Sequence, residues 1–482
     1  MTPAGDAARP PAGGVDFRAH SVRELAAQVR SAERSATELV GAALARIEAL
    51  DPSIGAFVAV DGERALEQAA AVDQLVAAGG EPGPLAGIPL AVKDLEDAAG
   101  YPTTHGSPLH RDPAPAVADS AHVARLRAAG CVVVGKTNTP EYGWTAHTAN
   151  AVFGVTNNPW DLDCSPGGSS GGSAAALAAG MVPLATGSDG GGSIRIPSSC
   201  CGLSGVKTSM GRVPMGGPES PDWPDLSVRG PMARRVADIV AALDVVVGPE
   251  ATDLRSLPRP EASWPAVLDR PSPPARIAWS PSLGYASVDR EVLSICERAV
   301  RVLESLGSEV VVLDTVFDED PVDDWIVMTG AYLLRSLAPL RKLPGWDELH
   351  PNLELMLRGA ETLSAVDFLR AADRCHEMNV RLVELFHDVR LLVTPTLAGP
   401  PPPLSLGGSG LVNGQREVNW VRFTYPFNMT RSPAATVCAG TTRHGLPVGL
   451  QLIGPSHGDL VVLRSAAALE EALDWRELAP VG

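Results

Sequence analysis

The sequence predicts an α/β fold built as one domain with insertions, and three observations indicate it. Amphipathic helical segments alternate with short apolar runs bounded by turn residues, as where the helix expected at 120–129 leads into a strand at 131–135. The chain contains no internal repeat, and no linker divides the alternation. A length of 482 residues leaves the number of domains open by itself, so the one-domain organisation rests on the unbroken pattern.

The first elements are expected to be helical scaffold. Two amphipathic helices are predicted within residues 21–49, and the second opens with Ser35 followed three residues later by Glu38, the pattern of a capping box. A third helix is predicted at 63–78. Residues 1–16 have neither the basic start nor the apolar run of a signal peptide, and we expect them to form a disordered leader before a domain that spans 17–482.

The remaining elements continue the alternation. An apolar strand is expected at 85–94, and a helix at 232–247 is followed by a long surface connection at 249–275. Strands are then predicted at 276–280, 309–313 and 391–393, helices near 288–306, 321–337, 364–386 and 459–473, and further apolar segments at 434–439 and 447–453. The mostly helical segment 314–386 is a candidate cap over a pocket.

The stretch from Ser165 to Lys207 carries the strongest functional signal. Glycines flank Ser169 and Ser170 on both sides, as is typical of a constrained turn. A helix of small residues is expected at 173–179 and a buried strand at 181–186. The next segment, 188–193, reads SDGGGS, and its successive glycines can turn several N–H groups toward one oxyanion.

Three other interpretations of this stretch are less consistent with the sequence. A flexible Gly/Ser linker would lack the helix and the strand. A nucleophile elbow of the G-x-S-x-G type requires a strand directly before the serine, where this chain has the loop sequence around Pro159 and Pro166. The S-x-x-K pattern at Ser204–Lys207 lacks the companion motifs of the penicillin-binding enzymes. A constrained nucleophile turn therefore remains the preferred interpretation.

Lys93, at the end of the strand expected at 85–94, allows two interpretations. A lysine at the end of a strand commonly extends its ammonium group into water. In a site of low dielectric constant, desolvation would instead lower its pKa and make it a base. The segment itself does not decide between the two. None of the ten histidines lies in a motif that would pair it with a serine, although a Ser-His-Asp triad need not be local in sequence.

Composition excludes several classes of partner. The formal net charge is −17 and the isoelectric point is near 5.0, which argues against binding to nucleic acid. Seven cysteines, without a C-x-x-C pair, predict no zinc site and favour a reducing, cytoplasmic location. No apolar run is long enough to span a membrane. We expect neither a cofactor nor a metal, and either a monomer or a homodimer.

Three sequence blocks resemble those of the amidase signature family: GIPLAVK at 87–93, PGGSSGGS at 166–173 and SDGGGSIRIP at 188–197. The similarity extends to the PFN block at 426–428 and the GLPVG block at 445–449, so it covers most of the chain. The separation 193 − 169 = 24 residues matches the interval that this family keeps between its two serines. The resemblance implies a single large α/β/α domain whose central, twisted, mixed β-sheet is covered by helices on both faces.

The resemblance also implies roles for single residues. Ser193 would be the nucleophile, Ser169, after a cis peptide bond, the bridging serine, and Lys93 the base. The N–H groups of the glycines and of Ser193 would bind the oxyanion. The group expected to bind oxyanion or substrate is Gly190, Gly191, Gly192, Gly143 and Ser170. Asp189, Arg195 and Ser173 are expected to brace the loops.

The expected activity is hydrolysis of small to medium neutral amides. Gly190 and Ile196 resemble the residues of members that act on anilides and nylon-type cyclic oligomers, so aryl amides, carbamates (urethanes) and polyamide oligomers are candidate substrates. The alternative is the amidase subunit of a glutamyl-tRNA(Gln) amidotransferase, which usually has Thr and Gln at these two positions. A catalytically inactive binding protein is disfavoured because Lys93, Ser169 and Ser193 are all present.

Overall fold

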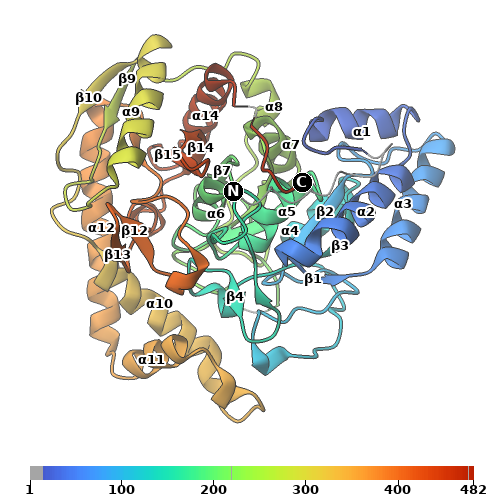
Figure 1. Cartoon of the computed structure of the whole chain (residues 1–482), viewed down its shortest axis with the longest axis horizontal. Coiled ribbons are helices and arrows are strands. Elements are labelled where there is room, and N and C mark those ends of the chain that lie inside the picture. The colour runs from blue at the N-terminus through green and yellow to red at the C-terminus, as the bar shows by residue number, and fades with distance from the viewer. Residues whose placement is uncertain (1–14, 219, 476) are drawn as a thin grey trace, which may run out of the picture.

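The computed structural model describes residues 15–218, 220–475 and 477–482 (Figure 1). A five-stranded sheet has the order β1-β3-β2-β6-β8, and a six-stranded sheet has the order β10-β9-β11-β15-β14-β7. The first sheet comprises β1 (Phe57–Val60), β2 (Pro89–Lys93), β3 (Val132–Thr137), β6 (Leu184–Asp189) and β8 (Val228–Met232). The second comprises β7 (Gly205–Lys207), β9 (Arg276–Trp279), β10 (Glu309–Val312), β11 (Leu392–Pro395), β14 (Ala434–Thr441) and β15 (Pro447–Ile453).

Both sheets are mixed, and they meet where β8 lies beside β7. In the first sheet β2 pairs in parallel with β3 and β6, while β1 and β8 are antiparallel edge strands. An isolated antiparallel bridge pairs Ser204 with Ala233, just outside the two named strands. The strands are thus divided between two sheets joined at one point. The expected α/β fold with mixed strands is confirmed.

Helices cover both faces of the strands. On one side lie α2 (Ala36–Ile54), α5 (Gly171–Ala178) and α6 (Arg195–Cys200), and on the other lie α7 (Val236–Val246), α9 (Arg290–Ser305) and α14 (Asp459–Leu473). Side chains of β15 alternate between these layers: Gln451 contacts Arg195 of α6, whereas Leu450 packs in the core cluster that includes residues of α9 and α14. The other helices of these layers are α1 (Val22–Arg30), α3 (Gly62–Ala77), α4 (Ala121–Ala128) and α8 (Trp264–Val267).

Local sequence explains how the N-terminal helices begin. The Ser35 hydroxyl accepts a hydrogen bond from the backbone N–H of Glu38 at 3.0 Å, and the Glu38 carboxylate accepts one from the Ser35 N–H at 2.7 Å. This reciprocal pair confirms the predicted capping box of α2. Ser21 and Glu24 form the same arrangement at α1. Helix α2 ends at Gly55, whose φ of +67° is favourable for glycine.

Three further helices form a separate lobe, at the lower left of Figure 1. They are α10 (Val322–Leu337), α11 (Pro351–Ala360) and α12 (Ala365–Asp388), and α10 packs against both of the others. The helices predicted at 321–337 and 364–386 are therefore confirmed. Helix α10 carries Leu333 and Trp325, which line two neighbouring cavities beside Ser193.

Several predicted boundaries were wrong, and some short elements were not predicted. The strand predicted at 181–186 is β6, which starts at Leu184, because Met181 still closes the turn after α5 through a hydrogen bond from its N–H to the Ala176 carbonyl. The helix predicted from Met232 begins at Val236, since Met232 ends β8. Strands β1, β7 and β8 and helix α6 were not predicted. They are three to six residues long, too short for a clear hydrophobic period.

The N-terminal end of the described chain packs against the core. Residues 1–14 of the expected leader lie outside the described residues, Val15 is buried in the core, and Asp16 pairs with Arg18. Among the helices that the structure describes, none combines the length and apolar character needed to cross a membrane.

We predict that Glu470 makes stability depend on pH at the junction of the two sheets. Its carboxylate accepts hydrogen bonds from the Ser204 hydroxyl and the Val236 N–H, and burial raises its pKa to about 7. The folded protein holds a proton on Glu470 more tightly than the unfolded chain does. The free energy of unfolding therefore falls by about 1–3 kcal/mol as the pH rises from about 4.5 through 7. Glu470→Gln should make the thermal midpoint fall less between pH 5 and pH 8. The exposed neighbour Glu471→Gln is the control, and equal slopes for wild type and Glu470→Gln would contradict the assignment.

Candidate active site

Lys93 is fully buried, with its amine between two serine hydroxyls. Strand β2 ends at this residue, and its backbone N–H donates to the Thr186 hydroxyl of β6 at 3.0 Å. The Lys93 Nζ lies 2.8 Å from the Ser169 Oγ and 2.9 Å from the Ser188 Oγ. Burial lowers the pKa of Lys93 to about 7, against the opposing charges of Glu96 and Asp189. Of the two interpretations, the structure supports the desolvated lysine rather than one that extends into water.

Ser169 lies in the loop that leads into α5. The peptide bond between Gly168 and Ser169 is cis, as the family resemblance implied. Ser169 is 2% exposed, and no strand leads directly into it, since β5 (Gly154–Val155) ends 14 residues earlier, which agrees with the rejection of a nucleophile elbow. The following residues brace the loop: Ser170 N–H donates to the Ser193 carbonyl at 3.2 Å, and the Ser173 hydroxyl donates to the Thr186 carbonyl at 2.8 Å. The two serine-bearing loops are therefore joined through their backbones.

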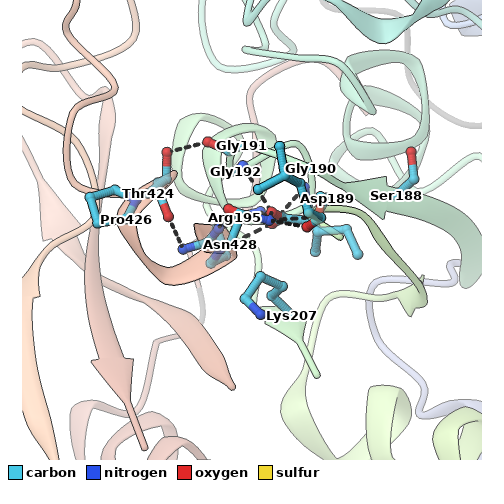
Figure 2. Close-up of polar contacts among 12 residues, drawn as sticks. Ser188, Asp189, Gly190, Gly191, Gly192, Arg195, Lys207, Thr424, Pro426 and Asn428 are labelled. Atoms are coloured by element: carbon cyan, nitrogen blue, oxygen red, sulfur yellow. Dashed lines mark hydrogen bonds and ion pairs between the residues drawn. The ribbon is translucent and has the colours of Figure 1, made fainter. Parts of the chain in front are cut away.

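Ser193 directly follows a turn, 189–192, that the carboxylate of Asp189 holds together. Figure 2 shows the contacts of Asp189 with Gly192 and Arg195. Asp189 ends β6 and accepts hydrogen bonds from the N–H groups of Gly192 and Ile194, at 2.8 and 3.2 Å. It also forms a buried ion pair with Arg195, whose Nη2 is 2.8 Å away. Burial raises the pKa of Asp189, but the charge and hydrogen bonds of Arg195 outweigh this and hold the pKa well below its usual value. The carboxylate thus stays ionised and fixes the turn.

Arg195 connects this turn to the C-terminal part of the chain. Its Nη1 donates to the Thr424 carbonyl at 2.9 Å and to the Gln451 side chain at 2.6 Å, and its Nη2 donates to the Asn428 amide oxygen at 2.7 Å. The Asn428 amide in turn donates to the Asp189 carbonyl at 2.7 Å. The guanidinium donates five hydrogen bonds in all, and every acceptor belongs to a buried residue. Its five N–H groups are thus all paired, as a buried charge requires. Asp189, Arg195 and Ser173 all hold the loops together.

The three glycines of the loop face large or polar neighbours. A Cβ on Gly190 would lie 2.6 Å from the Trp223 ring, and one on Gly191 would lie 2.6 Å from the Trp325 ring. Gly192 has a φ of +125°, and a Cβ there would lie 2.4 Å from the Thr424 hydroxyl. No side chain fits at these positions, which explains the run of glycines.

The loop's carbonyl groups are also held. Trp325 Nε1–H donates to the Gly190 carbonyl at 3.1 Å, and the Thr424 hydroxyl donates to the Gly191 carbonyl at 2.6 Å, as Figure 2 shows for Thr424. With both carbonyls turned away, the N–H groups of Gly190, Gly191 and Ser193 have no acceptor among the described residues. The Gly192 N–H, expected to bind the oxyanion, instead donates to Asp189. Three of the four expected donors therefore remain.

Two cavities meet at Ser193. The first, which we call the polar chamber, has a volume of about 730 Å³ including its mouth. Its lining comprises Leu95, Glu96, His105, Tyr142, Gly143, Ser169, Ser188, Gly190, Ser193, Met215, Pro221, Asp222, Trp223, Ser227, Arg229, Leu333, Ser336 and Leu337. Both serines of the expected relay thus line one chamber.

The second cavity, which we call the aromatic chamber, has a volume of about 410 Å³. Its lining comprises Gly143, Trp144, Thr145, Ala146, Gly168, Gly191, Ser193, Ile196, Trp223, Trp325, Val421 and Tyr425. Trp325 packs edge-on against Trp223, with ring centroids 6.0 Å apart, and lies 5.6 Å from the Tyr425 ring. Since Ser193, Gly143 and Trp223 line both cavities, the polar and aromatic chambers flank the serine.

The structure separates the expected substrate-binding residues into two groups. Gly143, with a φ of +70°, lines both chambers, and a Cβ there would lie 3.0 Å from the Ser169 Oγ. Ser170, in contrast, is fully buried, and its hydroxyl lies 3.4 Å from the Ser188 backbone N and O. Ser170 therefore contributes to the loop rather than to the described lining of either chamber.

Sequence reasoning missed several residues of the site. Ser188 was read only as part of the glycine segment, yet its hydroxyl is the second partner of Lys93. Trp223, Trp325 and Tyr425 come from three distant segments and enclose the aromatic chamber. Trp223 lies in a proline-rich loop and Trp325 on an amphipathic helix, so neither carried a local signal. In the sequence, only Gly190 and Gly191, which leave room for the rings of Trp223 and Trp325, indicated large neighbours at this place.

The chain matches known proteins over most of its length. The Amidase family matches residues 38–463. The chain is 38% identical over 471 residues to an acylamidase of Rhodococcus erythropolis, covering 95% of this chain and 97% of that protein. The structure of a bacterial aryl acylamidase superposes with a TM-score of 0.89 at 30% identity, over 96% of this chain and 98% of that one.

The structure of a 6-aminohexanoate cyclic dimer hydrolase, solved with its substrate, superposes with a TM-score of 0.87 at 29% identity, over 97% of this chain and 100% of that one. These matches span nearly the whole chain, and they agree with the mixed sheets and the helical layers described above. The chain therefore belongs to the amidase signature family, and it is a hydrolase of carbon–nitrogen bonds other than peptide bonds.

Proposed function

We propose that the protein hydrolyses amides through an acyl-enzyme on Ser193, with Ser169 and Lys93 as a proton relay. The observation that carries the proposal is the contact of 2.8 Å between the Lys93 amine and the Ser169 hydroxyl, in a chamber that Ser193 also lines. With a pKa of about 7, a large fraction of Lys93 is neutral near neutral pH. A neutral amine can accept a proton, which an ordinary lysine cannot.

The proton moves along this path in both directions. As the Ser193 oxygen bonds to the substrate carbonyl carbon, the Ser193 proton passes to the Ser169 oxygen, and the Ser169 proton passes to Lys93 Nζ. When the C–N bond breaks, the proton returns from Lys93 through Ser169 to the departing nitrogen, which leaves as an amine. Water then attacks the acyl-enzyme by the same route and releases the acid and free Ser193.

The negative charge that develops on the carbonyl oxygen needs fixed donors. The N–H groups of Gly190, Gly191 and Ser193 are the available ones, because Gly192 is held by Asp189. Each well-placed donor of this kind contributes about 3 kcal/mol to the stabilisation of a transition state. The contacts of Trp325 and Thr424 with the loop carbonyls keep these donors oriented before the substrate binds.

The aromatic chamber supports amides with an aryl or apolar group next to the scissile bond. Its tryptophans and Tyr425 offer ring faces and edges of the kind that bind aromatic groups. An aryl acylamidase and a cyclic amide dimer hydrolase are among the proteins of similar structure. We therefore favour aryl amides and short polyamide oligomers, with carbamates (urethanes) as a related class that the same attack on a carbonyl would cleave.

The amidotransferase subunit is the less supported alternative. The Thr that such subunits usually carry at the position of Gly190 would place its Cβ 2.6 Å from the Trp223 ring. Ile196, in place of their usual Gln, lines the aromatic chamber and makes it more apolar. Hydrolysis of simple amides by the purified chain, without ATP or partner subunits, would distinguish the two.

The overall organisation is part of the proposal. We infer that 17–482 acts as one domain and that the segment 314–386 caps the pocket, because Leu333 and Leu337 of α10 line the polar chamber. The seven cysteines form no disulfide in the described part of the chain, which supports a reducing, cytoplasmic location.

We predict that Ser193→Ala abolishes turnover of aryl amides and prevents labelling by a fluorophosphonate probe, because the proposed acyl-enzyme forms on the Ser193 oxygen. The measurement is release of the aryl amine, together with mass spectrometry of the labelled protein. Ser170→Ala is the matched control, since this buried neighbouring serine lines neither chamber and the variant should still be labelled. Retention of activity by Ser193→Ala would refute the nucleophile assignment.

We predict that kcat/KM rises about tenfold per pH unit below pH 7 and levels off above about pH 8, because only neutral Lys93 accepts a proton. Lys93→Met should lower kcat by about 10²- to 10⁴-fold. Lys207, a second buried lysine with a pKa lowered to about 7, provides the control: Lys207→Met should retain the pH profile. A rate that is flat from about pH 5 to about pH 9 would contradict the role of Lys93.

A further inference from the structure

Arg229 occupies a position in the polar chamber that the proposed reaction does not use. It lies on β8, paired in the sheet with Ser188, whose hydroxyl contacts the Lys93 amine. Its side chain lines the same chamber as Ser169 and Ser193. The pairing of β6 with β8 therefore places a guanidinium group beside the reacting residues.

The guanidinium of Arg229 donates no hydrogen bond to any residue that the structure describes. Its one recorded partner is Glu96, and the distance of 3.8 Å from Nη1 to Oε2 is that of an ion pair without a hydrogen bond. The side chain is 23% exposed. Arg195, by comparison, donates to four different residues. A guanidinium carries five N–H donors, and those of Arg229 remain open to a group bound in the chamber.

Glu96 limits which group Arg229 can bind. Its Oε2 already faces the His122 ring at 3.1 Å and the Ser120 hydroxyl at 3.3 Å, so the carboxylate is held away from a closer contact with Arg229. Glu96 nevertheless supplies a negative charge beside the guanidinium, and Asp222 adds another in the lining. A neutral oxygen acceptor suits this surrounding better than a carboxylate on the substrate does, because like charges in one site repel.

We propose that Arg229 binds a second carbonyl oxygen of the substrate, away from the scissile amide, so that the preferred substrates have an aryl or apolar group on one side of the bond and a neutral carbonyl on the other. The apolar group lies in the aromatic chamber, and the second carbonyl extends into the polar chamber. This assignment rests on the proposed function, because Ser193 between the two chambers defines which bond is cleaved. It selects amides with two or more carbonyls, such as linear or cyclic oligoamides.

The test compares substrates that differ only in the second carbonyl. One pair is the 4-nitroanilide of pentanoic acid and that of an acid of equal length ending in a primary amide. The other pair reverses the orientation, with benzamides of an alkylamine and of an amine ending in a primary amide. In at least one orientation, the wild type should prefer the carbonyl-bearing substrate by about 10- to 100-fold in kcat/KM, the range of a hydrogen bond to a charged group.

Substitutions at Arg229 test whether this residue causes the preference for the carbonyl-bearing substrate. Arg229→Met should remove this preference, and Arg229→Lys, which retains a donor and the charge, should retain part of it. The ratio of the kcat/KM values of the two substrates in a pair is measured at a pH above about 8, where the rate no longer depends on pH. The charge of Arg229 also acts on Lys93, so a substitution at Arg229 can change the reactivity of the site. Such a change affects both substrates of a pair and cancels in the ratio. Arg298→Gln, on α9, removes one exposed positive charge elsewhere and should leave the ratio unchanged.

The outcomes separate this inference from the proposed function. Absence of turnover of all four substrates would overturn both. Turnover without a preference, or a preference that Arg229→Met retains, would overturn the role of Arg229 and leave the reaction in place. A preference for a matched terminal carboxylate over the primary amide would overturn the neutral-acceptor assignment.

Discussion

The buried pair of Asp189 and Arg195 is the interaction on which the site depends. The carboxylate folds the turn by binding the N–H groups of Gly192 and Ile194, and the guanidinium ties that turn to Thr424, Asn428 and Gln451. A pair removed from water is tolerated only when all of its hydrogen bonds are made, and here they are made by groups from both sheets. The position of Ser193 is thus set by contacts that are distant in sequence.

The environment of a buried lysine, rather than its burial, decides what it can do. Lys136 lies 3.1 Å from the Asp94 carboxylate, so it is a paired ion within the scaffold. Lys207 donates to the Thr208 carbonyl and lines neither of the two chambers. Lys93 alone of the three contacts two hydroxyl groups that open into a cavity. Neutral hydroxyls do not hold its charge as a carboxylate would, and a lowered pKa follows from burial.

The part of the site that sequence could predict is the part with a local pattern. Glycines around Ser169 and in the 188–193 segment indicated backbones that a Cβ would obstruct, and the blocks around Lys93 indicated its family role. The aromatic chamber could not be predicted, since its rings come from a loop, an inserted helix and a segment near the C-terminus. Long periodic helices such as α12 were predicted nearly to the residue. Short strands such as β7 depend on pairing with neighbours and carried no pattern of their own.

The groups that hold the turn at 189–192 come from parts of the chain that are synthesised at different times. Lys93, Ser169 and Ser193 all leave the ribosome within the first 193 residues, but Gln451, which holds Arg195, is made 256 residues after that arginine. At translation rates of about 5–20 residues per second, Arg195 is without this partner for roughly 13–50 seconds. A nascent chain would therefore lack this contact between Arg195 and the second sheet until Gln451 has been made.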